Sequence, residues 1–92
     1  MIASFADKDT ERLFNGFAAS RLRGIERAAR KKLLILHAAT YINELKAPPG
    51  NHLELLLGRR QGQYSIRINA QWRLCFRWQS GTAYDVEIVD YH

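Results

Sequence analysis

The sequence predicts an α+β fold in which N-terminal helices pack on one face of a small twisted antiparallel β-sheet. Apolar residues recur at helical spacing in the first half of the chain and at every second position in the second half. Residues 47–50, which contain both prolines, separate the two patterns. The 92 residues are enough for one domain, which we expect to span residues 1–92.

The first half is expected to hold a short strand over residues 2–5 and then two helices. Asp7 or Asp9 can cap the first helix, which would carry Leu13, Phe14 and Phe17. A longer helix is expected over residues 22–39, followed by a short helical turn over residues 41–45. The longer helix has an apolar face with recurring positions at Ile25, Ala28, Ala29, Lys32, Leu33 and Leu36. Its other side carries Arg23, Arg27, Arg30 and Lys31.

The second half is expected to form strands over residues 53–56, 64–68, 72–78 and 84–90, with turns at 69–71 and 80–81. Alternation assigns one face to Tyr64, Ile66, Ile68, Trp72, Leu74, Phe76 and Trp78, and Val86 and Ile88 are expected to point inward. The opposite face would display Arg67, Arg73 and Arg77. The strand period therefore predicts an arginine-rich face that is open to solvent.

The charge distribution agrees with an anionic partner. Fourteen Lys and Arg stand against nine Asp and Glu, which gives a net charge of +5. The basic residues concentrate between positions 21 and 32 and between positions 59 and 77, and such segments favour nucleic-acid phosphates over an acidic protein or an anionic membrane. No signal sequence or membrane span is visible, and the lone Cys75 excludes an intramolecular disulfide. We therefore expect a soluble, cytoplasmic protein without a membrane partner.

The candidate chemistry needs no cofactor. His37, His52 and His92 lack metal-site spacing, and no glycine loop of a nucleotide fold is present. RNA can be cut without a metal when one group moves a proton and a cation stabilises the phosphate. Arg73, Asp90, Tyr91 and His92 could supply these groups. Each residue also has an ordinary alternative. His92 would be a frayed terminal residue, and Tyr91 would close the edge of the core. Asp90 would only pair with an arginine, and Arg73 would be a surface residue of the sheet.

Three segments carry a resemblance to a known family. They are residues 58–69 (GRRQGQYSIRIN), residues 71–78 (QWRLCFRW) and the ending 86–92 (VEIVDYH). They resemble the HigB branch of the RelE/ParE toxin superfamily, also called plasmid-maintenance killer proteins, and in particular its GraT-like chromosomal members. The opening Met1-Ile2 with Ser4-Phe5 and the bridge at residues 48–51 are similar as well, so the resemblance covers nearly the whole chain.

The resemblance implies the toxin of a type II toxin–antitoxin pair that cuts mRNA on the ribosome without a metal. It implies a HigA-type helix-turn-helix antitoxin as partner, with operator DNA bound only through that antitoxin. The family's catalytic arginine corresponds to Arg73, and its C-terminal acid, aromatic and histidine correspond to Asp90, Tyr91 and His92. Arg67 would support RNA binding, together with Arg59, Arg60 and His52.

Two positions depart from the family pattern. Related toxins carry a His and a Lys before the motif glycine, where this chain has Glu54 and Leu57. Leu57 cannot hold a phosphate and Glu54 would repel one, so a weaker or differently tuned nuclease is predicted. A non-cleaving inhibitor that binds the ribosome or RNA is the alternative. A gyrase-targeting toxin of the ParE kind is a third hypothesis, against which the Asp90-Tyr91-His92 ending argues.

Overall fold

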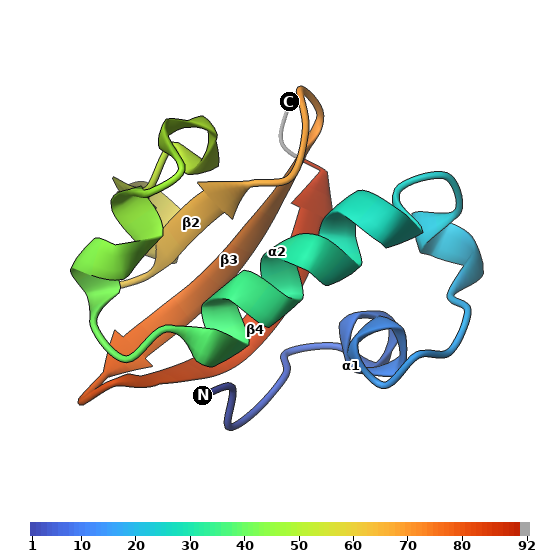
Figure 1. Ribbon diagram of the computed structural model, residues 1–92, viewed down its shortest axis with the longest axis horizontal. Helices are drawn as coiled ribbons and strands as arrows, with labels where there is room; N and C mark the ends of the chain where they lie inside the picture. Colours follow the sequence, from blue (N-terminus) through green and yellow to red (C-terminus); the bar gives the residue numbers. More distant parts are fainter. Residues whose placement is uncertain (91–92) are drawn as a thin grey trace.

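A computed structural model describes residues 1–90 as helices packed on one face of a four-stranded antiparallel sheet (Figure 1). The strand order is β1-β2-β3-β4, so each strand pairs with its neighbour in sequence. The predicted α+β architecture is confirmed. The elements are α1 (Lys8–Phe14), η1 (Ser20–Leu22), α2 (Glu26–Ala38), η2 (Ile42–Lys46), η3 (Pro49–Asn51), β1 (Glu54–Leu55), η4 (Gly58–Arg60), β2 (Tyr64–Arg67), β3 (Trp72–Gln79) and β4 (Thr82–Asp90).

The core lies between the helices and the sheet. Helix α2 crosses the face of β3 and β4, and α1 lies beside it (Figure 1). The apolar face of α2 contributes Ala29, Leu33 and Leu36, and the strands contribute Ile66, Leu74, Phe76, Val86 and Ile88, all of them buried as alternation predicts. None of the helices among residues 1–90 has the length and apolar character needed to cross a bilayer.

Glycines limit each of the two α-helices at one end, Gly16 after α1 and Gly24 before α2. Helix α1 begins after Asp7, whose carboxylate accepts a hydrogen bond from the backbone N–H of Thr10 at 3.1 Å. Gly16 has a φ of +90°, so the helix stops at Phe14 and the predicted place of Phe17 within it is wrong. Gly24 has a φ of +92°, which delays the start of α2 to Glu26.

The N-terminal segment covers the edge of β4, but it is not the predicted strand. Residues 2–5 form only two isolated parallel bridges, Ile2 to Ala83 and Phe5 to Val86. A register shift opposite them leaves one extra residue in β4, and Asp85 adopts a φ of +52° there. The hydroxyl of Ser4 accepts a hydrogen bond from the Asp85 N–H at 2.9 Å. This bulge keeps Val86 in the core and protects the edge strand.

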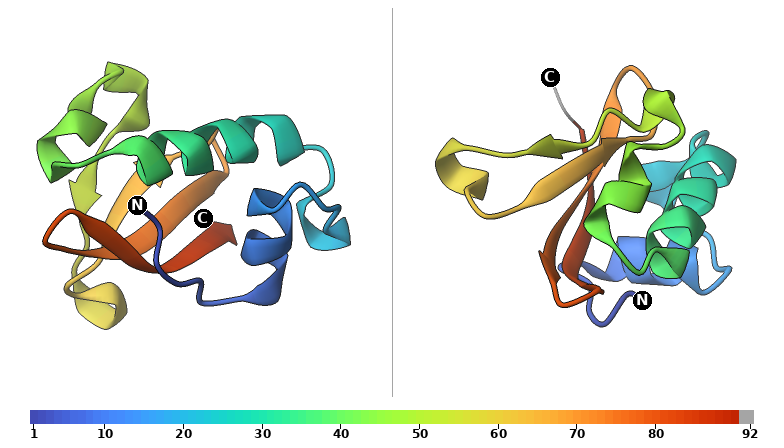
Figure 2. Two further views of the ribbon diagram at one scale, coloured as in Figure 1. Left: turned by 60° about the horizontal axis from the view of Figure 1, so that its bottom comes forward. Right: turned by 60° about the vertical axis from the view of Figure 1, so that its left-hand side comes forward.

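The face of the sheet away from the helices is partly covered. In the right-hand view of Figure 2 the chain around β1 and η4 extends away from the helices, on the other side of the sheet. Ser65 and Cys75 lie on this face by register, yet both are fully buried. The prediction of an open arginine-rich face is therefore wrong in part, because the side chain of Arg73 is only 11% exposed. Arg67 is half-buried, and Arg77 is exposed as expected.

Candidate RNA-binding and catalytic site

Arg73 is the most firmly held cation of the candidate site. Its Nε donates to the hydroxyl of Ser65 at 2.8 Å, and its terminal nitrogen donates to the backbone carbonyl of His52 at 2.6 Å. The same nitrogen lies 3.8 Å from the carboxylate of Glu54. These contacts come from β2, from the segment before β1 and from β1 itself. A guanidinium fixed from several sides presents its charge in one orientation, which is what recognition of a phosphate requires.

Arg67 lies directly opposite Arg73 in the pairing of β2 with β3. Its Nε donates to the carbonyl of Asn69 in the adjoining turn at 3.0 Å. Two like charges at opposite positions of a sheet repel each other. The pair thus concentrates positive charge at the end of the β2–β3 hairpin, where an anion would relieve the repulsion.

Asp90 is the last described residue of β4 and pairs in register with Trp72. Its carboxylate accepts a hydrogen bond from the side-chain amide of Gln71 at 3.0 Å. Arg73 pairs with Val89, so Asp90 lies one position further along β4, at the same end of the sheet. Strand β4 thus brings Asp90 to the same end of the sheet as Arg73, but on the face of Trp72 rather than on that of Arg73. Tyr91 and His92, the other two C-terminal candidates, lie outside the described residues.

The two arginines of η4 have different surroundings. Arg60 is half-buried and forms an ion pair with Glu87 at 3.1 Å, and it also donates to the side-chain carbonyl of Gln63 at 3.1 Å. Glu87 neutralises this cation and ties η4 to β4. Arg59 is exposed. Leu57, just before η4, is 81% exposed, so an apolar side chain is presented to solvent next to these two arginines.

His52 contributes its backbone to the candidate site. The residue has a left-handed conformation with a φ of +46°, and it follows Asn51, which is fully buried. The Asn51 amide donates to the carbonyls of Leu45 and Ala47, and its oxygen accepts a hydrogen bond from Lys32 of α2. Asn51 therefore fixes the loop in which the following carbonyl group, that of His52, accepts the hydrogen bond from Arg73. This contact also explains why Lys32 lies on the apolar side of α2.

Cys75 lies between Ser65 and Glu87 in the cross-strand register. Burial raises the pKa of its thiol, which outweighs the opposing effect of Arg60 and Arg73. A protonated buried thiol is a poor nucleophile. Within residues 1–90, no group of three or more His, Cys, Asp or Glu side chains is arranged to hold a metal ion.

Sequence reasoning missed Ser65 and Glu87 as parts of this site. A signal for Ser65 exists, because the turn at residues 69–71 sets the register of β2 against β3 and so places Ser65 diagonally from Arg73. The Asn69 carboxamide accepts hydrogen bonds from the backbone N–H groups of Gln71 and Trp72 at 2.8 Å each, which fixes that turn. Glu87 depends on the position of η4, for which the sequence has no periodic signal.

The sequence matches known toxins over almost its whole length. Residues 3–92 match the family described as RelE-like toxin of type II toxin-antitoxin system HigB. The chain is 42% identical over 85 residues to toxin HigB-1 of Vibrio cholerae serotype O1, which covers 90% of each protein. It is 34% identical over 94 residues to the endoribonuclease HigB of Proteus vulgaris, which covers both proteins fully.

The fold of residues 1–90 agrees with that of RelE-like toxins, with its helices on one face of an antiparallel sheet. A toxin of a type II system has an antitoxin as its partner. The match over residues 3–92 and the two relatives together establish the family, and the chain belongs to the HigB-like toxins of type II toxin–antitoxin systems.

Proposed function

We propose that the chain is a metal-independent endoribonuclease that cuts mRNA on the ribosome, with Arg73 stabilising the scissile phosphate. The single observation that carries the proposal is the fixed guanidinium of Arg73, held by Ser65 and His52 beside a second arginine, Arg67. A relative that aligns over its full length is named an endoribonuclease, which supports the same activity here.

The proposed chemistry is attack of a ribose 2′-hydroxyl on the adjacent phosphorus. A bond from O2′ to phosphorus forms, the bond from phosphorus to O5′ breaks, and the 2′-proton leaves while O5′ gains a proton. His92 would act as general acid or base in these transfers, because imidazole exchanges protons near neutral pH. Asp90 would orient His92, and Tyr91 would stack on a base of the RNA. Arg73 would hold the charge that builds up on the phosphate oxygens.

Arg67 and Arg59 would bind neighbouring phosphates, and His52 and Arg60 would shape the approach to them. The Arg60–Glu87 ion pair supports a structural part for Arg60. The exposed Arg59 on η4 supports direct contact with the backbone of the RNA.

The chain is further proposed to be a GraT-like, attenuated member of the family. Glu54 lies 3.8 Å from Arg73 and competes with a phosphate for the same cation. The exposed Leu57 adds no charge to the site. The proposed partners are a HigA-type helix-turn-helix antitoxin, the ribosome and mRNA, with operator DNA reached through the antitoxin. The place of action is the cytoplasm, where translating ribosomes are found.

The test is induction of the chain in cells, followed by mapping of mRNA 5′ ends. Wild type should produce new ends on translated messages, and Arg73→Ala and His92→Ala should produce none while they remain folded. Arg77→Ala, on the same strand and the same face as Arg73, serves as the matched control and should retain cutting. An absence of new ends with wild type would refute the nuclease.

The Glu54–Arg73 ion pair favours one second candidate, a toxin that binds the ribosome or its RNA without cutting. Growth arrest would then survive His92→Ala and weaken only when Arg67 and Arg73 are both neutralised. The two candidate functions therefore predict different results for one variant, His92→Ala. Its growth and its mRNA 5′ ends are measured in the same culture.

A further inference from the structure

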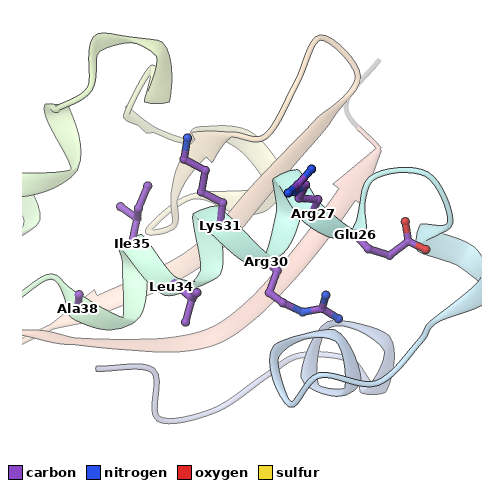
Figure 3. Close-up of a pocket in the computed structure, with 7 residues that line it drawn as sticks. All are labelled: Glu26, Arg27, Arg30, Lys31, Leu34, Ile35 and Ala38. Carbon is purple, nitrogen blue, oxygen red and sulfur yellow. The ribbon is translucent and has the colours of Figure 1, made fainter.

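We propose that the outer face of α2 is the surface on which the antitoxin docks, through an acidic segment that also carries apolar side chains. The outer face is defined as Arg27, Lys31, Leu34, Ile35 and Ala38. With Glu26 and Arg30 these residues line a shallow surface pocket of about 790 Å³ (Figure 3). The inference rests on the toxin having an antitoxin partner, and its test is separate from that of the nuclease.

The residues of the outer face form one continuous stripe. Arg27, Lys31, Leu34 and Ala38 are spaced by four, three and four positions, which places them above one another along the helix. All four are exposed, and Leu34 is 56% exposed although it is an apolar residue of a central helix. The N-terminal half of the stripe is basic and its C-terminal half is apolar.

The basic half is unfavourable for the isolated chain. Arg27 and Lys31 are like charges four positions apart, and Arg27 lies in the first turn of α2, where the helix dipole disfavours a cation. The pKa of Lys32 is lowered, chiefly by its burial and to a smaller extent by the positive charge of Lys31. Across residues 1–90, neither Arg27 nor Lys31 forms an ion pair with a carboxylate. Helix stability does not explain these charges, whereas an acidic partner would offset them.

Arg30 differs from the other basic residues of this pocket. Its Nε donates to the carbonyl of Leu13 at 3.0 Å, so the side chain braces α1 against α2. Figure 3 shows it extending toward α1, whereas Lys31 extends away from that helix. Among residues 1–90, the cations of the proposed surface that form no side-chain hydrogen bond or ion pair are therefore Arg27 and Lys31.

The apolar half of the stripe favours a protein over RNA as the occupant. Leu34 and Ala38 present aliphatic surface that a phosphate backbone cannot bury, and Ile35 at its margin is half-buried. An acidic peptide with aliphatic side chains matches both halves, as in helices that bind grooves. The outer face also lies on the opposite side of the sheet from Arg73, because α2 packs on the face that carries Leu74 and Ile88. The cation cluster proposed for RNA is thus a different surface.

The experiment measures the affinity of the chain for its antitoxin, by calorimetry at low and high KCl. The double variant Arg27→Glu/Lys31→Glu should weaken binding at least about tenfold and reduce its salt dependence. The matched control Lys8→Glu/Arg23→Glu makes the same charge change at exposed sites outside the stripe, and its affinity should stay within about twofold of wild type. The proposal would be overturned if both double variants weakened antitoxin binding equally, or if neither of them weakened it.

A second pair of variants guards against loss of folding, which circular dichroism monitors in each case. Leu34→Ser should weaken antitoxin binding, whereas Leu55→Ser, at a similarly exposed leucine of β1, should not. If Arg27→Glu/Lys31→Glu lost cosedimentation with ribosomes but kept its affinity for the antitoxin, the stripe would bind RNA and the proposal would be refuted. Mapping of mRNA 5′ ends in the same variants keeps the two proposals apart, since a chain that cuts nothing can still bind its antitoxin through α2.

Discussion

Arg67 and Arg73 occupy directly opposite positions of β2 and β3, so two cationic side chains start from paired positions at one end of the sheet. Their repulsion opposes folding of the free chain, and bound phosphate would relieve it. The pair therefore behaves as expected of a binding site rather than of a stabilising contact, since binding sites often hold interactions that the free protein would be more stable without.

Neutralising Arg67 should weaken RNA binding without loss of stability. We expect Arg67→Gln to lower the slope of log affinity against log salt by about 0.7 for a single-stranded RNA, which corresponds to one lost phosphate contact. Fluorescence anisotropy with a labelled oligonucleotide across a KCl series measures this slope. Arg23→Gln, at an exposed arginine before α2, is the control. An unchanged slope in Arg67→Gln would place Arg67 outside the RNA site.

Removing the charge of Glu54 should strengthen the toxin. The Glu54 side chain is 53% exposed and its carboxylate lies 3.8 Å from Arg73, so the ion pair is weak but still competes for the arginine. Glu54→Gln is expected to raise RNA affinity and the cleavage rate about two- to fivefold, the range that exposed ion pairs of up to ~1 kcal/mol allow. Glu11→Gln on α1 makes the same charge change away from the site. Lower activity in Glu54→Gln would show that the carboxylate assists the reaction instead.

Thr10 should be important for stability although it lies far from Arg73. Its buried hydroxyl accepts a hydrogen bond from the backbone N–H of Ile88 at 3.0 Å and donates to Asp7 at 2.6 Å. Thr10→Val leaves a buried N–H without its acceptor, which should lower the free energy of unfolding by about 1–3 kcal/mol. Urea denaturation measures the loss. Thr82→Val, at a half-buried threonine of β4, should change it by less than about 0.5 kcal/mol.

The sequence predicted the layers of this fold well because each of them has a clear period. The apolar positions of α2 and the alternation of β3 are visible without any long-range contact. The cover over the arginine face was not predictable in this way. The sequence predicts a strand over residues 53–56, yet β1 has only two residues, and Leu55 and Leu57 are exposed. The burial of Arg73 depends on the His52 carbonyl and on Ser65, contacts that local patterns do not specify.

The short helix η2 should respond to acid through Glu44. The Glu44 carboxylate accepts hydrogen bonds from the Thr40 hydroxyl and from the backbone N–H groups of Thr40 and Tyr41, which together lower its pKa below the ordinary value of a glutamate. A lowered pKa in the folded state stabilises the protein above the ordinary pKa, and that contribution is lost as the pH falls through the folded value.

Glu44→Gln keeps an oxygen acceptor but removes the titration. The decrease in unfolding free energy between about pH 5.5 and about pH 3 should therefore be smaller in this variant than in wild type. Urea melts at a series of pH values measure it, with Glu11→Gln as the charge-matched control. A decrease of equal size in wild type and Glu44→Gln would contradict the expected role of this cap.

Arg73→Lys separates charge from geometry at the proposed catalytic centre. Lysine keeps the positive charge but lacks the planar fork that donates at once to Ser65 and to the His52 carbonyl. We expect RNA affinity to change little and the rate of mRNA cleavage to fall by about 10²–10³, as when one positioned donor to a developing charge is lost. The control is Arg77→Lys, four residues further along β3 on the same face, and its cleavage rate should stay within a few-fold of that of wild type. Near-equal cleavage by Arg73→Lys and wild type would mean that Arg73 acts only as a charge, and that its fixed orientation is not needed for the reaction.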